Sequence, residues 1–184
     1  KGMRVNSYEF PKSSFLGMPK DCALLMDKIL SNQNLLKLLY YNGRDWKEKP
    51  DLTSEQIKGM LSSDPEKRQI SLVPRLYIHP EVHTYLHISY GKFYPNATNP
   101  HYRDNTFYID IYCHYEDWDL GNYELKPYRI AGELDAMLDG KHLTGIGELQ
   151  FIEAGPAIYN EDFAGVSLTY YAIRGDEDKK NPLE

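Results

Sequence analysis

Four histidines have the residue type and spacing that could bind a metal ion. His79, His83 and His87 follow one another at intervals of four residues, and His114 lies further along the chain. Even spacing on one strand puts side chains on the same face of a sheet, and histidine nitrogens are common zinc ligands. However, Pro80 interrupts the run, and no flanking acidic residue stands out as a partner that would orient the imidazoles. We therefore predict a solvated or intersubunit face here, and no metal site.

A second group of residues that could do chemistry is acidic. Glu116, Asp117 and Asp119 surround Trp118. Clustered carboxylates can bind calcium or act as general acids and bases. This cluster lacks the spacing of an EF-hand loop, and it follows a predicted strand just before a turn. We therefore expect it to form a solvated loop.

Motifs for nucleophilic or phosphate chemistry are absent from the sequence. A serine nucleophile would be expected in a setting such as a G-x-S-x-G elbow, which does not occur. The short run Gly145-Ile146-Gly147 precedes a predicted strand and is typical of a turn, whereas a phosphate-binding loop follows a strand. We therefore predict no catalytic residue, no cofactor and no enzymatic activity.

Alternating apolar and polar residues predict the strands that would position these side chains. The clearest strand is 105–115, where apolar and polar or tyrosine side chains take turns. Its apolar set is Phe107, Ile109, Ile111 and Cys113, and its other set is Tyr108, Asp110, Tyr112 and His114. The polar segment 95–104 is too long for a tight hairpin, so we expect it to project from the sheet. Further strands are predicted at 69–78 (an edge or bulged strand, because of Pro74), 83–90, 146–153 and 165–174.

Helical spacing of apolar residues predicts the elements that cover the sheet. A first stripe begins at Asp21, and a short second helix follows around 35–39. Thr53 and Gln56 form a capping-box pattern that opens a third helix. The clearest helix is 127–139, which Gly140 ends. This order predicts an α+β fold, with a largely antiparallel sheet of about four to five strands and helices packed on one face.

Composition and charge bound the domain organisation. We expect residues 1–20 to form an extended arm, 21–174 a single α+β domain and 175–184 a flexible charged tail. The net charge of −6, with scattered basic residues, argues against nucleic-acid binding. Cys22 and Cys113 lie in no metal or redox motif, so a reducing cytoplasm is the default. No apolar run reaches membrane-spanning length, and no signal peptide is visible, so no membrane partner is expected.

Tyrosine is unusually abundant, with 16 residues. Tyrosine combines a wide apolar face with a polar tip and is enriched at protein interfaces, although it also suits half-buried strands. The apolar arm could lie on a neighbouring subunit or fold back on its own domain. The residues that we predict to form an assembly interface are Tyr8, Phe10, Phe15, Tyr94, His101, Tyr102, Arg103, Tyr108 and Tyr112.

The order of segments resembles the tail-terminator and tail-completion proteins of long-tailed phages. The N-terminal part, at 32–41 and 49–53, looks like that of phage neck proteins. The C-terminal half is more telling, because a hydrophobic strand leads to an amphipathic helix, a glycine-containing connection and a last strand. These segments are 107–114, 127–131 with the helix end at 139–140, 143–149 and 163–170. The similarity covers roughly residues 20–174, and the arm and the longer 95–104 loop depart from it.

The resemblance implies a structural virion protein of the tail or neck, assembled in the host cytoplasm. Its implied partners are other copies of itself in a ring, commonly a hexamer, the tail-tube protein, and the head–tail connector or stopper protein. DNA would only pass through the lumen, and an acidic lumen would let it pass without adhering. The alternatives are another neck protein, such as a head-completion adaptor or stopper, an unrelated soluble binding module, and a small metal-dependent enzyme that uses His83, His87 and His114.

Overall fold

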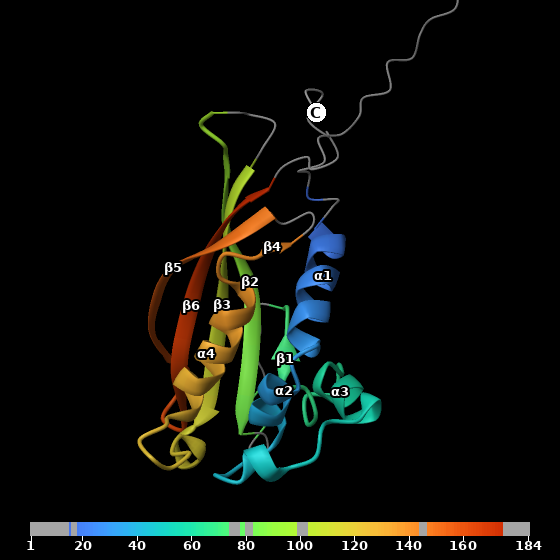
Figure 1. The fold of residues 1–184 in the computed structure, drawn as a ribbon, viewed down its shortest axis with the longest axis vertical. Helices are drawn as coiled ribbons and strands as arrows, with labels where there is room; N and C mark the ends of the chain where they lie inside the picture. Colours follow the sequence, from blue (N-terminus) through green and yellow to red (C-terminus); the bar gives the residue numbers. More distant parts are fainter. Residues whose placement is uncertain are drawn as a thin grey trace, which may run out of the picture.

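The computed structural model describes most of the chain and shows one sheet with helices along one side (Figure 1). The described residues are 15, 18–73, 78–79, 83–98, 103–143 and 147–174. The helices are α1 (Met18–Leu30), α2 (Gln33–Tyr40), η2 (Trp46–Glu48), α3 (Ser54–Met60), η3 (Tyr115–Asp117) and α4 (Lys126–Leu138). The strands are β1 (Ile70–Ser71), β2 (Thr84–Pro95), β3 (Arg103–His114), β4 (His142–Leu143), β5 (Gly147–Ile158) and β6 (Phe163–Arg174).

The sheet has six strands in the order β1-β2-β3-β6-β5-β4. Its four long strands are antiparallel, and only β1 runs parallel to its neighbour β2. The predicted α+β class and the largely antiparallel pairing are confirmed, but the predicted count of four to five strands was too low. The strand predicted at 69–78 contains β1, which has two residues, and the strand that was not predicted is β4. β4 also has two residues, which is too short for an alternating pattern to appear in the sequence.

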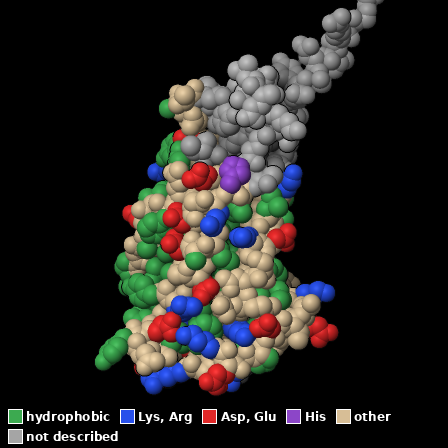
Figure 2. Space-filling model, viewed as in Figure 1, with side chains coloured by type: hydrophobic (Ala, Val, Ile, Leu, Met, Phe, Trp, Pro, Cys, Tyr) green, Lys and Arg blue, Asp and Glu red, His purple; other side chains and the backbone are tan. Residues whose placement is uncertain are grey.

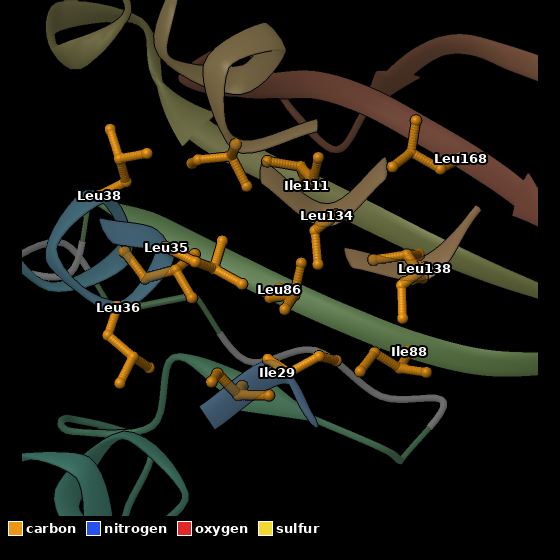
Figure 3. Packing of buried hydrophobic residues seen from close by; sticks show 14 of the residues in the cluster. Ile29, Leu35, Leu36, Leu38, Leu86, Ile88, Ile111, Leu134, Leu138 and Leu168 are labelled. Atoms are coloured by element: carbon orange, nitrogen blue, oxygen red, sulfur yellow. The ribbon is translucent and has the colours of Figure 1, made fainter. Parts of the chain in front are cut away.

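The core lies between the helices and one face of the sheet. On β3, Phe107, Ile109, Ile111 and Cys113 are all buried, as the alternation predicted. Figure 3 shows leucines of α2 and α4 pointing toward apolar residues of β2, β3 and β6. The pKa of the Cys113 thiol is raised to about 12 by its burial, so this cysteine acts as an apolar core residue.

Local sequence signals explain where the helices begin and end. The Asn32 side chain accepts a hydrogen bond from the Leu35 N–H and caps α2, and Thr53 with Gln56 forms the predicted capping box of α3. Pro127 lies in the first turn of α4, where its missing N–H costs nothing. Gly140 follows the end of α4 with a φ of 63°, a conformation that favours glycine.

A buried ion pair joins the start of α4 to η3, and hydrogen bonds tie both groups to the loop that follows α2. Lys126 is 0% exposed and Asp117 is 5% exposed, and the Lys126 ammonium group pairs with the Asp117 carboxylate. The same ammonium donates to the Tyr41 carbonyl at 3.0 Å, and the carboxylate accepts the Gly43 N–H at 2.7 Å. The prediction of a solvated acidic loop was therefore wrong for Asp117. It holds for exposed Asp119, which pairs with Arg44 at 2.5 Å.

Gly165 allows β6 to approach β3 closely. A Cβ atom at Gly165 would lie 1.9 Å from the Ile111 carbonyl oxygen, which belongs to the backbone and cannot swing away. Gly155 on β5 differs, because nothing lies within 4 Å of a Cβ atom placed there. The pairing of β3 with β6 in the middle of the sheet therefore requires glycine at 165.

We predict that Gly165→Ala lowers the free energy of unfolding by about 1–3 kcal/mol, because the added methyl group must displace the strand backbone. Gly155→Ala is the matched control, and its effect should stay within about 0.5 kcal/mol. Urea unfolding at one protein concentration measures both values. Equal effects for the two variants would show that the close approach at Gly165 is unimportant.

We predict that Lys126→Met costs about 3–5 kcal/mol of stability, because it leaves the Asp117 carboxylate buried and unpaired. The control Arg44→Met removes an exposed ion pair and should cost about 1 kcal/mol or less. The double variant Lys126→Met/Asp117→Leu should lose less stability than the sum of its two single variants. A double-mutant cycle measures this coupling, and strictly additive losses would contradict it.

Candidate assembly surface

The face of the sheet that points away from the helices carries polar and aromatic side chains. Tyr108, Asp110 and Tyr112 alternate with the buried residues of β3 and therefore point to this opposite face. α2 and α4 make the helix contacts with the long central strands, and they lie on the other side (Figure 1). Of the predicted interface residues of β3, Tyr108 and Tyr112 belong to this helix-free face, whereas Arg103 has the parity of the buried residues.

A polar cluster spans three adjacent strands on the helix-free face. The His87 Nδ1 atom lies 3.4 Å from Asp110 Oδ2, and the Ser167 hydroxyl donates to Asp110 Oδ1 at 2.5 Å. In a Ser-His-Asp triad the imidazole lies between the hydroxyl and the carboxylate, so that it can take the serine proton. Here the carboxylate occupies the middle position. The geometry therefore provides no imidazole base for Ser167, and we interpret the cluster as a cross-strand contact that supports the sheet.

Two of the other candidate histidines, His83 and His114, form ring contacts at the end of the same face. The rings of His83 and His114 stack with centroids 5.2 Å apart, and His114 also lies edge-on to Phe163 at 5.0 Å. The His79 backbone N–H donates to the Tyr85 hydroxyl at 2.6 Å. Within the described ranges, no group of three or more His, Cys, Asp or Glu side chains is arranged to hold a metal ion.

The predicted interface residues near the β2–β3 connection lie at one end of the molecule. The exposed Phe15 ring lies edge-on to Phe93 with centroids 5.1 Å apart, and the Arg103 guanidinium lies 5.2 Å from the Phe15 centroid. Tyr94 of β2, which pairs with Asp104 of β3, is exposed. Phe15 therefore contacts its own domain, and the course of the predicted arm stays a prediction. Tyr8, Phe10, His101 and Tyr102 lie outside the described residues.

Tyr108 and Tyr112 occupy the predicted strand but differ in environment. Tyr108 is exposed on the helix-free face. The Tyr112 ring packs edge-on to Tyr159 with centroids 5.6 Å apart. Burial raises the pKa of the Tyr112 hydroxyl, and the nearby Asp110 and Tyr159 raise it further. Their roles in an assembly interface remain predictions.

An apolar stripe on β5 was not among the predicted interface residues. Phe151, Ile152 and Ile158 are 42%, 48% and 78% exposed, and Ala154 and Pro156 between them are also exposed. Figure 2 shows hydrophobic side chains gathered along this edge of the molecule, with acidic side chains beside them. We call Phe151, Ile152, Ala154, Pro156 and Ile158 the β5 stripe. Large apolar side chains grouped on a surface mark an interaction site more often than isolated ones do.

The β5 stripe escaped sequence analysis because a bulge disrupts the alternation. The register between β5 and β6 shifts between Phe151 and Glu153, so Ile152 is an additional residue in the strand. The predicted strand ended at residue 153, whereas β5 continues to Ile158. The run of apolar residues from 154 to 158 was the available signal, but Gly155 and Pro156 within it are more typical of a turn.

No curated protein matches the chain. Among solved structures, a chain described as "Virion of native gene transfer agent (GTA) particle" is similar, with 16% identity and a TM-score of 0.41, over 66% of this chain and 90% of that one. No helix in the described part of the chain combines the length and apolarity needed to cross a membrane. A family model described as YomW matches residues 32–172, which is most of the chain. The chain belongs to the YomW family.

Proposed function

We propose that this protein is a structural subunit of a tailed-phage particle, and specifically a tail-terminator ring subunit that caps the tail tube and joins it to the head connector. The YomW family is phage-associated, which supports a role in a phage particle. The order of strands and helices that resembled tail-terminator proteins supports the more specific role. Copies of the chain and the neighbouring neck proteins would be its partners.

The observation that carries the proposal is the β5 stripe. An isolated monomer gains nothing from leaving the exposed parts of Phe151, Ile152 and Ile158 in water, because burial of this remaining apolar surface would contribute roughly 1–2 kcal/mol for each side chain. A subunit that is buried in an assembly needs such a surface. The described clusters of polar residues offer no comparable support for catalysis, since Ser167 contacts a carboxylate and not an imidazole.

The charge of the chain suits a protein that surrounds DNA without binding it tightly. Tight binding of the phosphate backbone requires Lys and Arg side chains that displace counterions. The chain instead has 27 acidic and 21 basic residues, for a net charge of −6. A lumen built from such subunits would let DNA slide through it.

A different position in the neck is the second candidate function. A head-completion adaptor or stopper also has to form contacts with copies of itself and with adjacent rings. The exposed Tyr94 at the far end of the β2–β3 hairpin could contact an adjacent ring in either case. The two functions differ in which structure fails to form when the subunit is missing.

We predict that phage particles made without this chain contain filled heads that do not join tails, and tails of irregular length. The physical reason is that a tube without its cap has no signal to stop adding subunits. Electron microscopy of lysates from a nonsense mutant in the gene measures tail length and head–tail joining. Restored expression of the wild-type chain is the control.

Two other outcomes would contradict the terminator role. Tails of normal length beside heads that lose their DNA would support the adaptor or stopper role. Complete particles of normal infectivity would exclude both neck functions.

A further inference from the structure

We propose that the β5 stripe of one copy docks on a hollow between α1, α3 and β1 of a second copy, so that the chain assembles head to tail. This inference rests on the proposed function and names the partner surface for the stripe. It depends on two different surfaces at opposite edges of one sheet. Both surfaces are apolar, and the charged residues around them have opposite signs.

The first surface is the β5 stripe, which lies on a strand whose outer edge is largely unpaired. The short strand β4 pairs with β5 only at Gly147 and Glu148, and no described strand pairs with the outer side of β5 from residue 153 to 158. The Phe151 N–H is already bonded to the Asp139 carboxylate at 2.8 Å. Pro156 has no N–H to offer, and the bulge at Ile152 twists the strand. Backbone pairing with another strand is therefore disfavoured, and the exposed apolar side chains are what a partner can bind.

The second surface is an apolar hollow of about 360 Å³ at the opposite edge of the sheet. Leu61, Leu72 and Val73 on its rim are 40%, 44% and 48% exposed. We call it the α3–β1 hollow, and its lining includes Met26, Leu61, Arg68, Ile70, Leu72 and Val73. The Phe151 and Ile158 side chains are large and apolar, so either of them could fill an apolar hollow of this volume.

Charge favours this pairing over a contact between two β5 strands. Residues 147–163 include four acidic residues and no Lys, Arg or His, and the acidic ones are Glu148, Glu153, Glu161 and Asp162. Arg68 is the charged residue in the lining of the α3–β1 hollow. A symmetric β5–β5 contact would bring like charges together, which is unfavourable, whereas the hollow offers an opposite charge.

The positions of the two surfaces also determine the kind of assembly. β5 and β1 lie toward opposite edges of the six-stranded sheet, as Figure 1 shows. A contact between two different surfaces is heterologous, and repetition of it closes into a ring when the rotation between copies permits. The stripe and the hollow together therefore supply both halves of the contact that a ring subunit needs.

Site-directed crosslinking tests this pairing in the full chain. Ile152→Cys places a thiol in the stripe, and Leu72→Cys places one on the rim of the hollow. Both positions are about half exposed, so both variants should fold, which circular dichroism checks. Cys22→Ser is included throughout to remove a partly exposed thiol, and Cys113 is buried. A short bismaleimide reagent is added to each variant alone and to their equimolar mixture.

We expect the mixture to give at least ten times more covalent dimer than either variant alone. A chain with both substitutions should give a ladder of larger oligomers. Lys47→Cys is the matched control, because the Lys47 side chain is 62% exposed on η2, an element that contributes to neither surface, and its mixture with Leu72→Cys should give only background. A dimer formed by Ile152→Cys alone would show β5–β5 pairing and overturn the proposal. A mixture that stays at the level of the control would overturn it as well.

The crosslinking result and the proposed function can fail separately. A chain that is located at the head–tail junction but gives only background crosslinking would retain the function and lose this contact. A chain that crosslinks as expected but does not affect tail length or head–tail joining would retain the contact and lose the function.

Discussion

The structure depends on one constraint: the two helices that pack on the long strands leave part of one face of the sheet uncovered. α2 and α4 pack over β2, β3 and β6, and the apolar side of these strands is fully buried beneath them. Tyr170 links the two layers, since its ring is buried and its hydroxyl donates to Asp135 of α4 at 2.9 Å. β5 lies at the margin of the helix layer, where α4 contacts it at few positions, so most of the apolar residues on its helix side remain exposed. The surface that we propose for assembly is therefore a direct consequence of how the helices sit on the sheet.

The helix-free face of the sheet is stabilised differently. Its side chains are bound to one another through ring contacts and through the Asp110 carboxylate, which contacts both His87 and Ser167. At the end of the sheet, the buried pair of Lys126 and Asp117 holds the start of α4 against the loop after α2. Breaking such a pair leaves an unpaired buried charge, so the position of α4 is strictly specified. A fixed position of α4 also fixes which part of β5 stays uncovered.

Sequence analysis predicted the elements whose pattern is set locally. The alternation from Phe107 to Cys113 and the apolar spacing of Ile130, Leu134 and Leu138 both identified buried faces correctly. The capping pair of Thr53 and Gln56 was also visible. The strand and helix patterns match the periodicity of one regular element, and the capping pair lies within a single helical turn.

The features that sequence analysis missed depend on contacts between distant segments. The Lys126 side chain is buried only because Asp117 and the Tyr41 carbonyl receive its charge, and a lysine is almost never buried without such partners. The bulge at Ile152 removed the alternation by which the end of β5 would have been recognised. The β5 stripe is exposed because α4 packs mainly on β3 and β6, and no pattern within β5 records that fact.

The most direct test of an assembly role is a cryo-electron microscopy map of the intact phage particle in which this chain is located. We predict a closed ring of copies at the head–tail junction, with the β5 stripe of each copy on the α3–β1 hollow of its neighbour. A map that places the chain away from that junction, or that leaves the β5 stripe of every copy in solvent, would contradict the proposal that these surfaces hold a ring together.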